Sequence, residues 1–363
     1  MSDLDAFIRG IPKAELHVHL EGCLEAELMF ELAVRNGLNL RWKSAEALRA
    51  AYQFTNLQTF LDLYYDGCRM LEQERDFYDL ARAYLSRAHA DGVIRAEVFI
   101  GPQSFTERGV GVAPIMHGVL AAMDDASREH AISAGLLVSA QRHRSEAEAL
   151  QMLESVLPWS DRIVGFGLGG AEAGNPPSKF ASYFRACRER GFRVTAHAGE
   201  EGPTSYVREA VDVLKVDRID HGNACLNDPA LVRELVERHI PLTVCPLSNL
   251  KLNVSPTLEA HPLRAMLAAG LCVTINSDDP AYFGGYISEN LLRCQRSLGL
   301  SMEDIATLAR NSFSAAFVPA ADAAQAVSSV NAYCDAFRKI PTAKSPDQST
   351  VGCLPEGSRA TYP

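Results

Sequence analysis

The sequence predicts an α/β fold, a (β/α)8 TIM barrel. Eight short apolar segments alternate with stretches of helical periodicity, which indicates parallel strands joined by helices. Histidine or acidic residues end the first, fifth, sixth and eighth segments, and a barrel mouth gathers those four strand ends where an open doubly wound sheet does not. The length of 363 residues and the hydrophobic content of 47% suit one large domain of this kind.

The elements follow in order along the chain. The first strand is expected at residues 14–20, and helical patterns from about residue 24 to residue 91 form an insertion after it. The other strands are expected at 95–100, 135–140, 162–168, 193–198, 218–221, 241–245 and 272–277. Helices are expected between them at 146–157, 177–190, 206–215, 229–237 and 262–269, with a last helix at 320–340. We therefore predict one catalytic domain over residues 1–340 and, because residues 341–363 are rich in Pro, Ser, Gly and Thr, a flexible tail there.

Charge and cysteine content narrow the class of protein. The formal net charge of −10 argues against a nucleic-acid or anionic-membrane surface and favours a small, neutral or weakly basic substrate. There is no apolar run long enough for a membrane span, and residues 1–10 lack the apolar core of a signal peptide. The nine cysteines are scattered without a Cys-x-x-Cys pair, which is typical of reduced core thiols in a cytoplasmic protein. The sequence by itself specifies no oligomeric state.

The strand ends carry residues suited to a metal site. His17 and His19 alternate along a strand and so point to the same side, where two imidazoles can bind one divalent cation. With His197 and Asp278 they form a set of three imidazoles and one carboxylate, which suits zinc and leaves a position for water. A divalent cation there would lower the pKa of that water to about 7.

Three further residues complete a hydrolytic site. Glu200 is placed to protonate a ring nitrogen of a substrate, His221 to position the water, and Asp279 to hydrogen-bond the substrate. Taken singly, the motifs have simpler interpretations, because a lone His-x-His is weak evidence and Asp-Asp-Pro is usually a turn or a helix N-cap. Their occurrence at four strand ends of one protein favours the joint metal site.

The remaining histidines and the cysteine after the seventh strand are less informative. His143 either faces the barrel mouth or lies at the surface, and Cys245 is interpreted as a packed core thiol rather than a catalytic one. The other five histidines are expected at the surface; they are His89, His117, His130, His239 and His261.

The site residues lie in longer motifs, which read LHVHLEG at 16–22, HAGE at 197–200, DHG at 220–222, CPLSN at 245–249 and NSDDP at 276–280. As a set, these motifs resemble the adenosine/adenine deaminase family of the amidohydrolase superfamily, and the similarity runs from about residue 11 to residue 318. The resemblance implies a TIM barrel of the metal-dependent hydrolase type with one zinc ion per chain. The implied zinc ligands are His17, His19, His197 and Asp278.

The resemblance also implies roles for the other residues. Glu200 becomes the proton donor to purine N1, His221 orients and helps to deprotonate the water, and Asp279 is the partner of purine N7. The loop at Gly170 is implied to contact purine N3 through its backbone amides.

Within the family, this chain is most similar to the adenine deaminases. Glu21 occupies the position at which adenosine deaminases typically carry an aspartate that meets the ribose 5′-hydroxyl, so Glu21 is expected to fill space that a ribose needs. Residues 54–61, 176–180 and 281–286 are also similar to that subgroup. The implied activity is the hydrolysis of adenine to hypoxanthine and ammonia in purine salvage.

Other functions remain as alternatives. The same chemistry could act on adenosine or on an N6-substituted adenine such as a cytokinin. A non-catalytic purine-binding barrel would require a lost ligand or proton donor, and none is lost. A two-metal hydrolase of phosphoesters or amides would need a carboxylated lysine in the fourth strand, and residues 162–168 contain no lysine.

Overall fold

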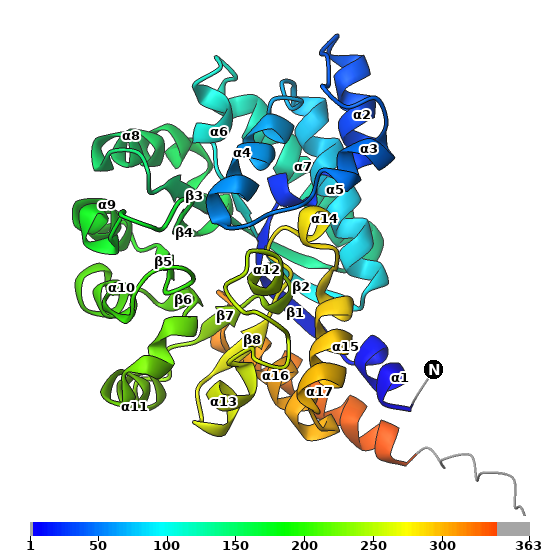
Figure 1. Cartoon of the computed structure of the whole chain (residues 1–363), viewed down its shortest axis with the longest axis vertical. Coiled ribbons are helices and arrows are strands. Elements are labelled where there is room, and N and C mark those ends of the chain that lie inside the picture. The colour runs from blue at the N-terminus through cyan, green and yellow to red at the C-terminus, as the bar shows by residue number, and fades with distance from the viewer. Residues whose placement is uncertain (1–2, 340–363) are drawn as a thin grey trace, which may run out of the picture.

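The computed structural model describes residues 3–339 and confirms the predicted barrel. Eight parallel strands follow one another in chain order, and helices form a layer outside them (Figure 1). All eight predicted strands are present, each within a few residues of its expected bounds. The strands are β1 (Lys13–His19), β2 (Val93–Ile100), β3 (Ser133–Gln141), β4 (Ile163–Gly169), β5 (Arg193–Ala198), β6 (Arg218–His221), β7 (Leu242–Val244) and β8 (Val273–Ile275).

The barrel closes through a short contact between its first strand and the residues after its last strand. Asp278 forms a parallel bridge with Val18. The Asp278 N–H donates to the His17 carbonyl oxygen at 3.0 Å, and the His19 N–H donates to the Asp278 carbonyl oxygen at 2.8 Å. The bonds that close the barrel therefore also place Asp278 beside the two histidines of β1.

The helices cover the outside of the barrel and, in the N-terminal part of the chain, one side of its mouth. Residues 24–91, predicted as a helical insertion, contain four of them. In chain order the helices are α1 (Asp3–Gly10), α2 (Ala26–Arg35), α3 (Ala45–Ala50), α4 (Leu57–Cys68), α5 (Glu74–Ala90), α6 (Gln103–Thr106), α7 (Val112–His130), α8 (Glu146–Val156), α9 (Ala181–Glu189), α10 (Thr204–Glu209), α11 (Pro229–Glu237), α12 (Pro246–Lys251), α13 (Leu263–Ala268), α14 (Pro280–Phe283), α15 (Ile287–Leu298), α16 (Met302–Ser314) and α17 (Ala320–Arg338). Short 3-10 or π turns lie at η1 (Glu21–Cys23), η2 (Leu157–Arg162), η3 (Pro177–Phe180), η4 (Ala210–Leu214) and η5 (Asn223–Asn227).

One helical prediction needs correction, one helix was missed, and the last helix begins where it was expected. The stretch 206–215 is not one helix, because α10 passes into the π turn η4, which ends at Lys215 with φ 58°. Helix α1 was not predicted; its buried Phe7 packs against the ring of Phe337 in α17, at 5.1 Å between ring centroids. The last helix ends at Arg338, and the predicted tail at 341–363 lies outside the described residues.

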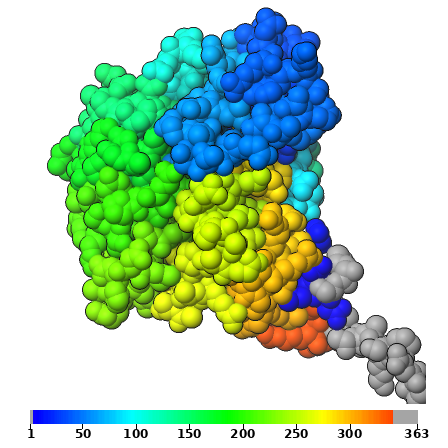
Figure 2. All heavy atoms as spheres, in the orientation of Figure 1, coloured from blue at the N-terminus to red at the C-terminus, as the bar shows by residue number. Residues whose placement is uncertain are grey.

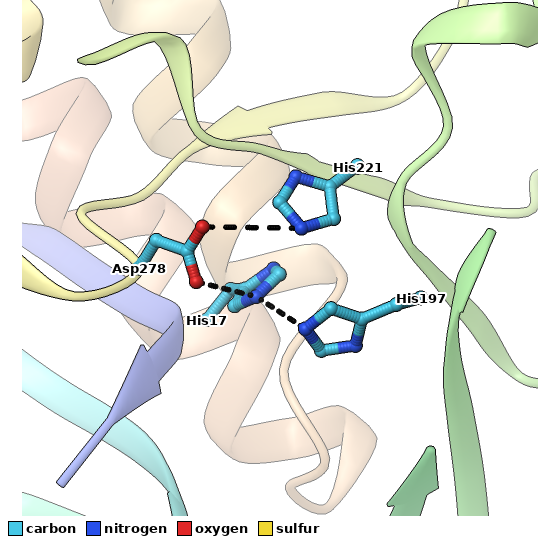
Figure 3. A group of neighbouring side chains, drawn as sticks. All are labelled: His17, His197, His221 and Asp278. Atoms are coloured by element: carbon cyan, nitrogen blue, oxygen red, sulfur yellow. Dashed lines mark hydrogen bonds and ion pairs between the residues drawn. The ribbon is translucent and has the colours of Figure 1, made fainter. Parts of the chain in front are cut away.

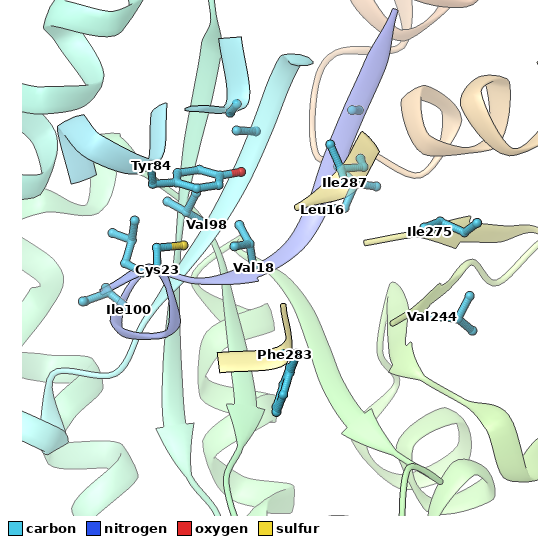
Figure 4. Packing of buried hydrophobic residues seen from close by; sticks show 14 of the residues in the cluster. Leu16, Val18, Cys23, Tyr84, Val98, Ile100, Val244, Ile275, Phe283 and Ile287 are labelled. Atoms are coloured by element: carbon cyan, nitrogen blue, oxygen red, sulfur yellow. The ribbon is translucent and has the colours of Figure 1, made fainter. Parts of the chain in front are cut away.

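The alternation of β1 separates its apolar and polar side chains. Leu16 and Val18 lie among buried apolar side chains of the neighbouring strands and helices, including Val98 of β2 (Figure 4). His17 and His19 alternate with them and face the interior of the barrel. The core thus anchors the strand on one face and leaves the histidines on the other.

A buried ion pair joins strands on opposite sides of the barrel. The guanidinium of Arg218 in β6 donates to Glu97 of β2 at 2.7 Å, and both side chains are fully buried. The guanidinium also donates to the Leu16 carbonyl oxygen and stacks over the ring of Phe317 at 4.2 Å. This network connects β1, β2 and β6 across the core of the barrel.

Helix α4 lies over the mouth of the barrel. It begins at a capping box in which Asn56 accepts from the Thr59 N–H and the Thr59 hydroxyl accepts from the Asn56 N–H. In the space-filling view, the blue mass that contains α2–α4 lies against the yellow segments that follow β7 and β8 (Figure 2). None of the helices between residues 3 and 339 is both long and apolar enough to cross a membrane.

Candidate active site

A cavity opens at the carboxyl ends of the strands, and most of the predicted site residues line it. Its empty volume is about 570 Å³, part of which is open to solvent. Seven of its lining residues were predicted from the sequence; they are His19, Gly170, His197, Glu200, His221, Asp278 and Asp279. His17 lies directly beneath, fully buried, within contact distance of His197 and Asp278.

The four predicted metal ligands converge on one point. The His197 Nε2 atom lies 3.1 Å from His17 Nε2 and 3.2 Å from His19 Nε2. The Asp278 Oδ1 atom lies 3.3 Å from His17 Nε2 and 3.4 Å from His19 Nε2. Zinc–nitrogen bonds of about 2.1 Å in a tetrahedron place ligand atoms about 3.4 Å apart, so this spacing fits one zinc ion.

The two buried histidines, His17 and His197, are arranged to share a cation rather than to hydrogen-bond each other. Nδ1 of His17 faces the Thr243 carbonyl oxygen at 3.3 Å, and Nδ1 of His197 lies 3.3 Å from the carboxylate of Asp220. Burial opposes a charge on His17, but the neighbouring Asp278 outweighs burial and raises the pKa of His17. Where both rings are neutral and each Nδ1 holds the proton, the lone pairs of the two Nε2 atoms face each other. A positive ion between them turns this repulsion into binding. Burial, with the nearby His17, lowers the pKa of His197 to about 4, so this ring is neutral at physiological pH.

A fourth histidine adjoins this group (Figure 3). His221 joins His17, His197 and Asp278 in a cluster whose potential ligand atoms lie within 4.8 Å of one another. However, His221 Nε2 lies 3.9 Å from Oδ2 of Asp278, whereas His17 and His19 face Oδ1. His221 instead faces Glu200, at 3.4 Å between Nε2 and Oε2. It therefore lies between the metal-binding set and the expected proton donor.

The surroundings of the Glu200 carboxyl favour its protonated form. Burial, together with the charges of Asp278 and Glu172, raises the pKa of Glu200 well above its usual value. Its Oε1 atom is buried and has no hydrogen-bond partner among the described residues. A neutral carboxyl group directed into a cavity is suited to donate a proton.

The two adjacent aspartates are in opposite states. Burial raises the pKa of Asp279 well above its usual value, and the neighbouring charge of Asp278 raises it further. Burial also opposes ionisation of Asp278, but its contacts with His17 and His19 outweigh burial and hold its pKa well below the usual range. The surroundings thus favour the anion of Asp278, which suits a metal, and the neutral form of Asp279, which can donate or accept a hydrogen bond.

Two site residues have unusual backbone conformations. His221 and Asp278 have φ values of 63° and 64°, in the left-handed region that residues other than glycine rarely adopt. Such conformations cost about 1–3 kcal/mol each and occur preferentially at functional sites. Here they direct both side chains toward the same point at the ends of β6 and β8.

The outer part of the cavity is shaped for a flat ring. Aromatic side chains from α4 and α14 cover it, and Gly170, with φ 89°, lies at the end of β4 where the backbone can approach a ligand. A few polar side chains also face it. Phe60 and Phe283 lie in the stretches 54–61 and 281–286, which the family resemblance singled out, and Tyr64 and Tyr65 lie in the same predicted helix as Phe60. The polar lining residues that sequence reasoning missed are Ser104, Ser139 and Gln141. The helical spacing of the residues in α4 was the available signal, but it did not show which face of the helix meets the barrel.

Glu21 lies next to this cavity but does not line it. The side chain is buried, and its Oε1 atom accepts a hydrogen bond from the N–H of Gly101, a lining residue, at 2.8 Å. Its Oε2 atom is buried without a partner among the described residues.

One predicted surface residue is in fact buried. His261 has only 3% of its surface exposed, because its Nε2 hydrogen-bonds the Asn249 side chain and its Nδ1 accepts from the Leu263 N–H. The prediction was wrong because the loop after α12 folds back over the barrel. His143 is exposed at the rim, with its ring 6.0 Å from that of Tyr65, and Cys245 is fully buried.

The comparisons of sequence and of structure with known proteins agree with one another. A family model described as adenosine deaminase matches residues 12–333. The adenine deaminase of Rhodopseudomonas palustris (strain BisB18) is 62% identical over 318 residues, which cover 88% of this chain and 93% of that protein.

Two solved structures are also similar. The crystal structure of adenine deaminase from Arthrobacter aurescens superimposes with a TM-score of 0.88 at 47% identity, covering 90% of this chain and all of that chain. An amidohydrolase from Burkhoderia ambifaria with bound Zn superimposes with a TM-score of 0.86 at 29% identity, covering 93% of this chain and 95% of that chain.

Proposed function

The chain belongs to the adenosine deaminase family, and on that premise we propose that it catalyses the hydrolytic deamination of adenine to hypoxanthine and ammonia. The observation that carries the proposal is the convergence of His17, His19, His197 and Asp278 on one point, with Glu200 facing the same cavity. We also propose that the enzyme acts in the cytoplasm in purine salvage. The free thiols, eight of eight among the described cysteines, support a reducing compartment.

These four side chains would hold one zinc ion. Zinc at this position would act as a Lewis acid and lower the pKa of a water molecule to about 7, which makes hydroxide available at neutral pH. The similar amidohydrolase with bound Zn supports this assignment, and β4 lacks a lysine that could bridge a second ion. Metal analysis should therefore give one zinc per chain, whereas two would contradict the single-metal site.

The chain's own residues would move the protons. His221 is placed to orient the attacking water and to accept its proton, since it lies between Asp278 and Glu200. Glu200, protonated before reaction, would donate to purine N1 as the oxygen of water bonds to C6. Asp279 would hydrogen-bond N7 and hold the ring in register. The C6–N6 bond then breaks as the amino group takes the proton held by His221 and leaves as ammonia. The C6 hydroxyl gives its proton to Glu200, which forms the carbonyl group of hypoxanthine and restores the acid.

The substrate is proposed to be the free base. Glu21 is buried beside the cavity wall and accepts from the Gly101 N–H, so its carboxylate does not line the cavity, where a ribose hydroxyl would need a partner. The similar proteins named adenine deaminase support the same choice over adenosine or an N6-substituted adenine. Ammonia release measured with adenine, adenosine and N6-isopentenyladenine tests it, and turnover of adenosine alone would refute it.

The role of Glu200 has its own test. Glu200→Gln keeps the shape of the side chain but removes the acidic proton. We expect this variant to retain its zinc and to lose nearly all turnover. A variant with the wild-type rate would show that another group protonates N1.

A further inference from the structure

The loop that carries Glu200 is held by a single carboxylate. Its four consecutive backbone N–H groups all point to Glu172, which follows β4. Glu172 Oε1 accepts from the Gly199 N–H at 2.7 Å. Its Oε2 atom accepts from the N–H groups of Glu200, Glu201 and Gly202 at 3.0, 2.8 and 2.8 Å.

These bonds replace secondary structure in the loop. Residues 199–202 lie after the end of β5 and before α10, and no other acceptor in residues 3–339 receives a hydrogen bond from these N–H groups. Gly199, with φ 73°, turns the chain so that successive N–H groups face one side. Such a concave arrangement of backbone N–H groups binds an anion, and here the anion is part of the same chain.

Glu172 is itself held firmly. Its side chain is almost completely buried, and the Arg142 guanidinium lies 3.8 Å from Oε1. That guanidinium is fully buried and donates to the carbonyl oxygens of His197 at 2.7 Å and Asn175 at 2.7 Å. The pair therefore connects the loop after β4 to the end of β5, where His197 lies.

The side chain of Glu200 needs this support. Apart from the 3.4 Å contact of Oε2 with His221, the described residues offer its carboxyl group no partner, so its direction depends on its backbone. A misplacement of about 1 Å in a reacting group can reduce the rate about 100-fold.

We propose that Glu172 is a positioning residue for proton transfer, which acts by holding the backbone of Glu200 so that its carboxyl group reaches the substrate. The inference rests on the proposed role of Glu200. It predicts an effect on kcat rather than on KM, because the purine ring is bound by other parts of the cavity.

Two variants test the inference. In Glu172→Ala all four N–H groups lose their acceptor, and we expect kcat to fall about 100-fold with KM within about threefold of wild type. In Glu172→Gln one oxygen remains while the amide nitrogen faces N–H donors, so kcat should fall about tenfold. The zinc content and the thermal unfolding of both variants are measured alongside their kinetics. If the alanine variant does not fold, the glutamine variant decides alone.

Rescue of kcat by acetate distinguishes the loss of this one carboxylate from a general loss of stability. Acetate matches the group of atoms that Glu172→Ala lacks, so adding acetate should raise kcat of this variant in a saturable manner and leave the wild type unchanged. The matched control is Glu146→Ala, which removes a carboxylate that accepts from the backbone N–H groups of Ser182 and Tyr183, away from the cavity. It should lower stability, keep kcat and show no response to acetate.

The outcomes separate the two proposals. A wild-type kcat in Glu172→Ala or Glu172→Gln overturns the inference, and so does a reduced kcat of a folded, zinc-loaded Glu172→Ala that acetate does not raise. Glu200→Gln is measured in parallel. If that variant keeps the wild-type rate, the proposed role of Glu200 fails, whatever the Glu172 variants do.

Discussion

Replacing Asp220 by asparagine should weaken zinc binding without disturbing the fold. Asp220 lies behind the metal-binding set, fully buried at the end of β6, with Oδ2 3.3 Å from His197 Nδ1. Its Oδ1 atom accepts from the hydroxyls of Thr195 at 2.8 Å and Thr243 at 3.0 Å. The Thr243 hydroxyl in turn lies 3.0 Å from Nδ1 of His17, so Asp220 supports two of the four ligands.

The expected loss of zinc affinity follows from the loss of a negative charge and of one hydrogen-bond acceptor. Burial alone would raise the pKa of Asp220, but His197, His17 and Arg218 hold it below the usual range, so the group is an anion. Asparagine has the same shape, is neutral, and turns an N–H toward either the histidine or the two threonines. Changes of this kind behind a metal ligand reduce metal affinity about 10- to 100-fold, or about 1.4–2.7 kcal/mol.

The assay is zinc competition against a chelator of known affinity, with activity measured at limiting and at saturating zinc. Saturating zinc should restore most of the activity of Asp220→Asn. The matched control is Asp217→Asn, which changes a carboxylate three positions earlier that binds the Val194 N–H and Arg193. A zinc affinity of Asp220→Asn within about twofold of the wild type would refute the reasoning.

Three further predictions concern stability and the cavity. Glu97→Ala removes the carboxylate that lies 2.7 Å from Arg218 and 2.9 Å from Arg95, and leaves Asp220 at 4.0 Å from the buried guanidinium of Arg218. It should lower the free energy of unfolding by about 3–5 kcal/mol in denaturant titration, and a loss below about 1 kcal/mol would contradict a buried ion pair. Gly170→Ala forces a side chain into a φ of 89° at the cavity wall and should reduce kcat/KM for adenine, while Gly174→Ala, with φ 76° and open space around it, should affect stability only. Alkaline pH should destabilise the reduced protein, because burial raises the pKa of four thiols to about 11 or 12 while the unfolded chain loses those protons from about pH 9. Their contribution is full below about pH 8 and should fall by roughly 1 kcal/mol per thiol between about pH 8 and pH 10. An unchanged free energy of unfolding over this range would contradict the prediction; the thiols are Cys187, Cys225, Cys272 and Cys294.

The strands were predictable because their signal is local. An apolar run such as 193–198 can be read from adjacent residues, and β5 has the expected bounds. The helices near the two ends of the chain were harder to predict. Helix α1 is short, and its burial depends on α17, more than 300 positions away in the chain. Similarly, His261 is buried by contacts that no local pattern reveals.

The positions of the main site residues were predictable for a related reason. In a barrel, all carboxyl ends of the strands meet at one mouth, so His17, His197, His221 and Asp278 had to lie near one another once their strands were identified. The distances among them, and the choice between Oδ1 and Oδ2 of Asp278, required the three-dimensional structure.

The sequence by itself determined the fold class, the family resemblance and the candidates for the site, because these depend on residue type, alternation and spacing. Only the tertiary structure decided what holds those residues in place. Glu172 lies 28 positions before Glu200 and has no local pattern that connects it to the loop, yet its carboxylate accepts all four of the loop's N–H groups. Asp220 and Thr243 support the histidines in the same way. These contacts join different strands, and their partners are set by the packing of the barrel rather than by the order of residues along the chain.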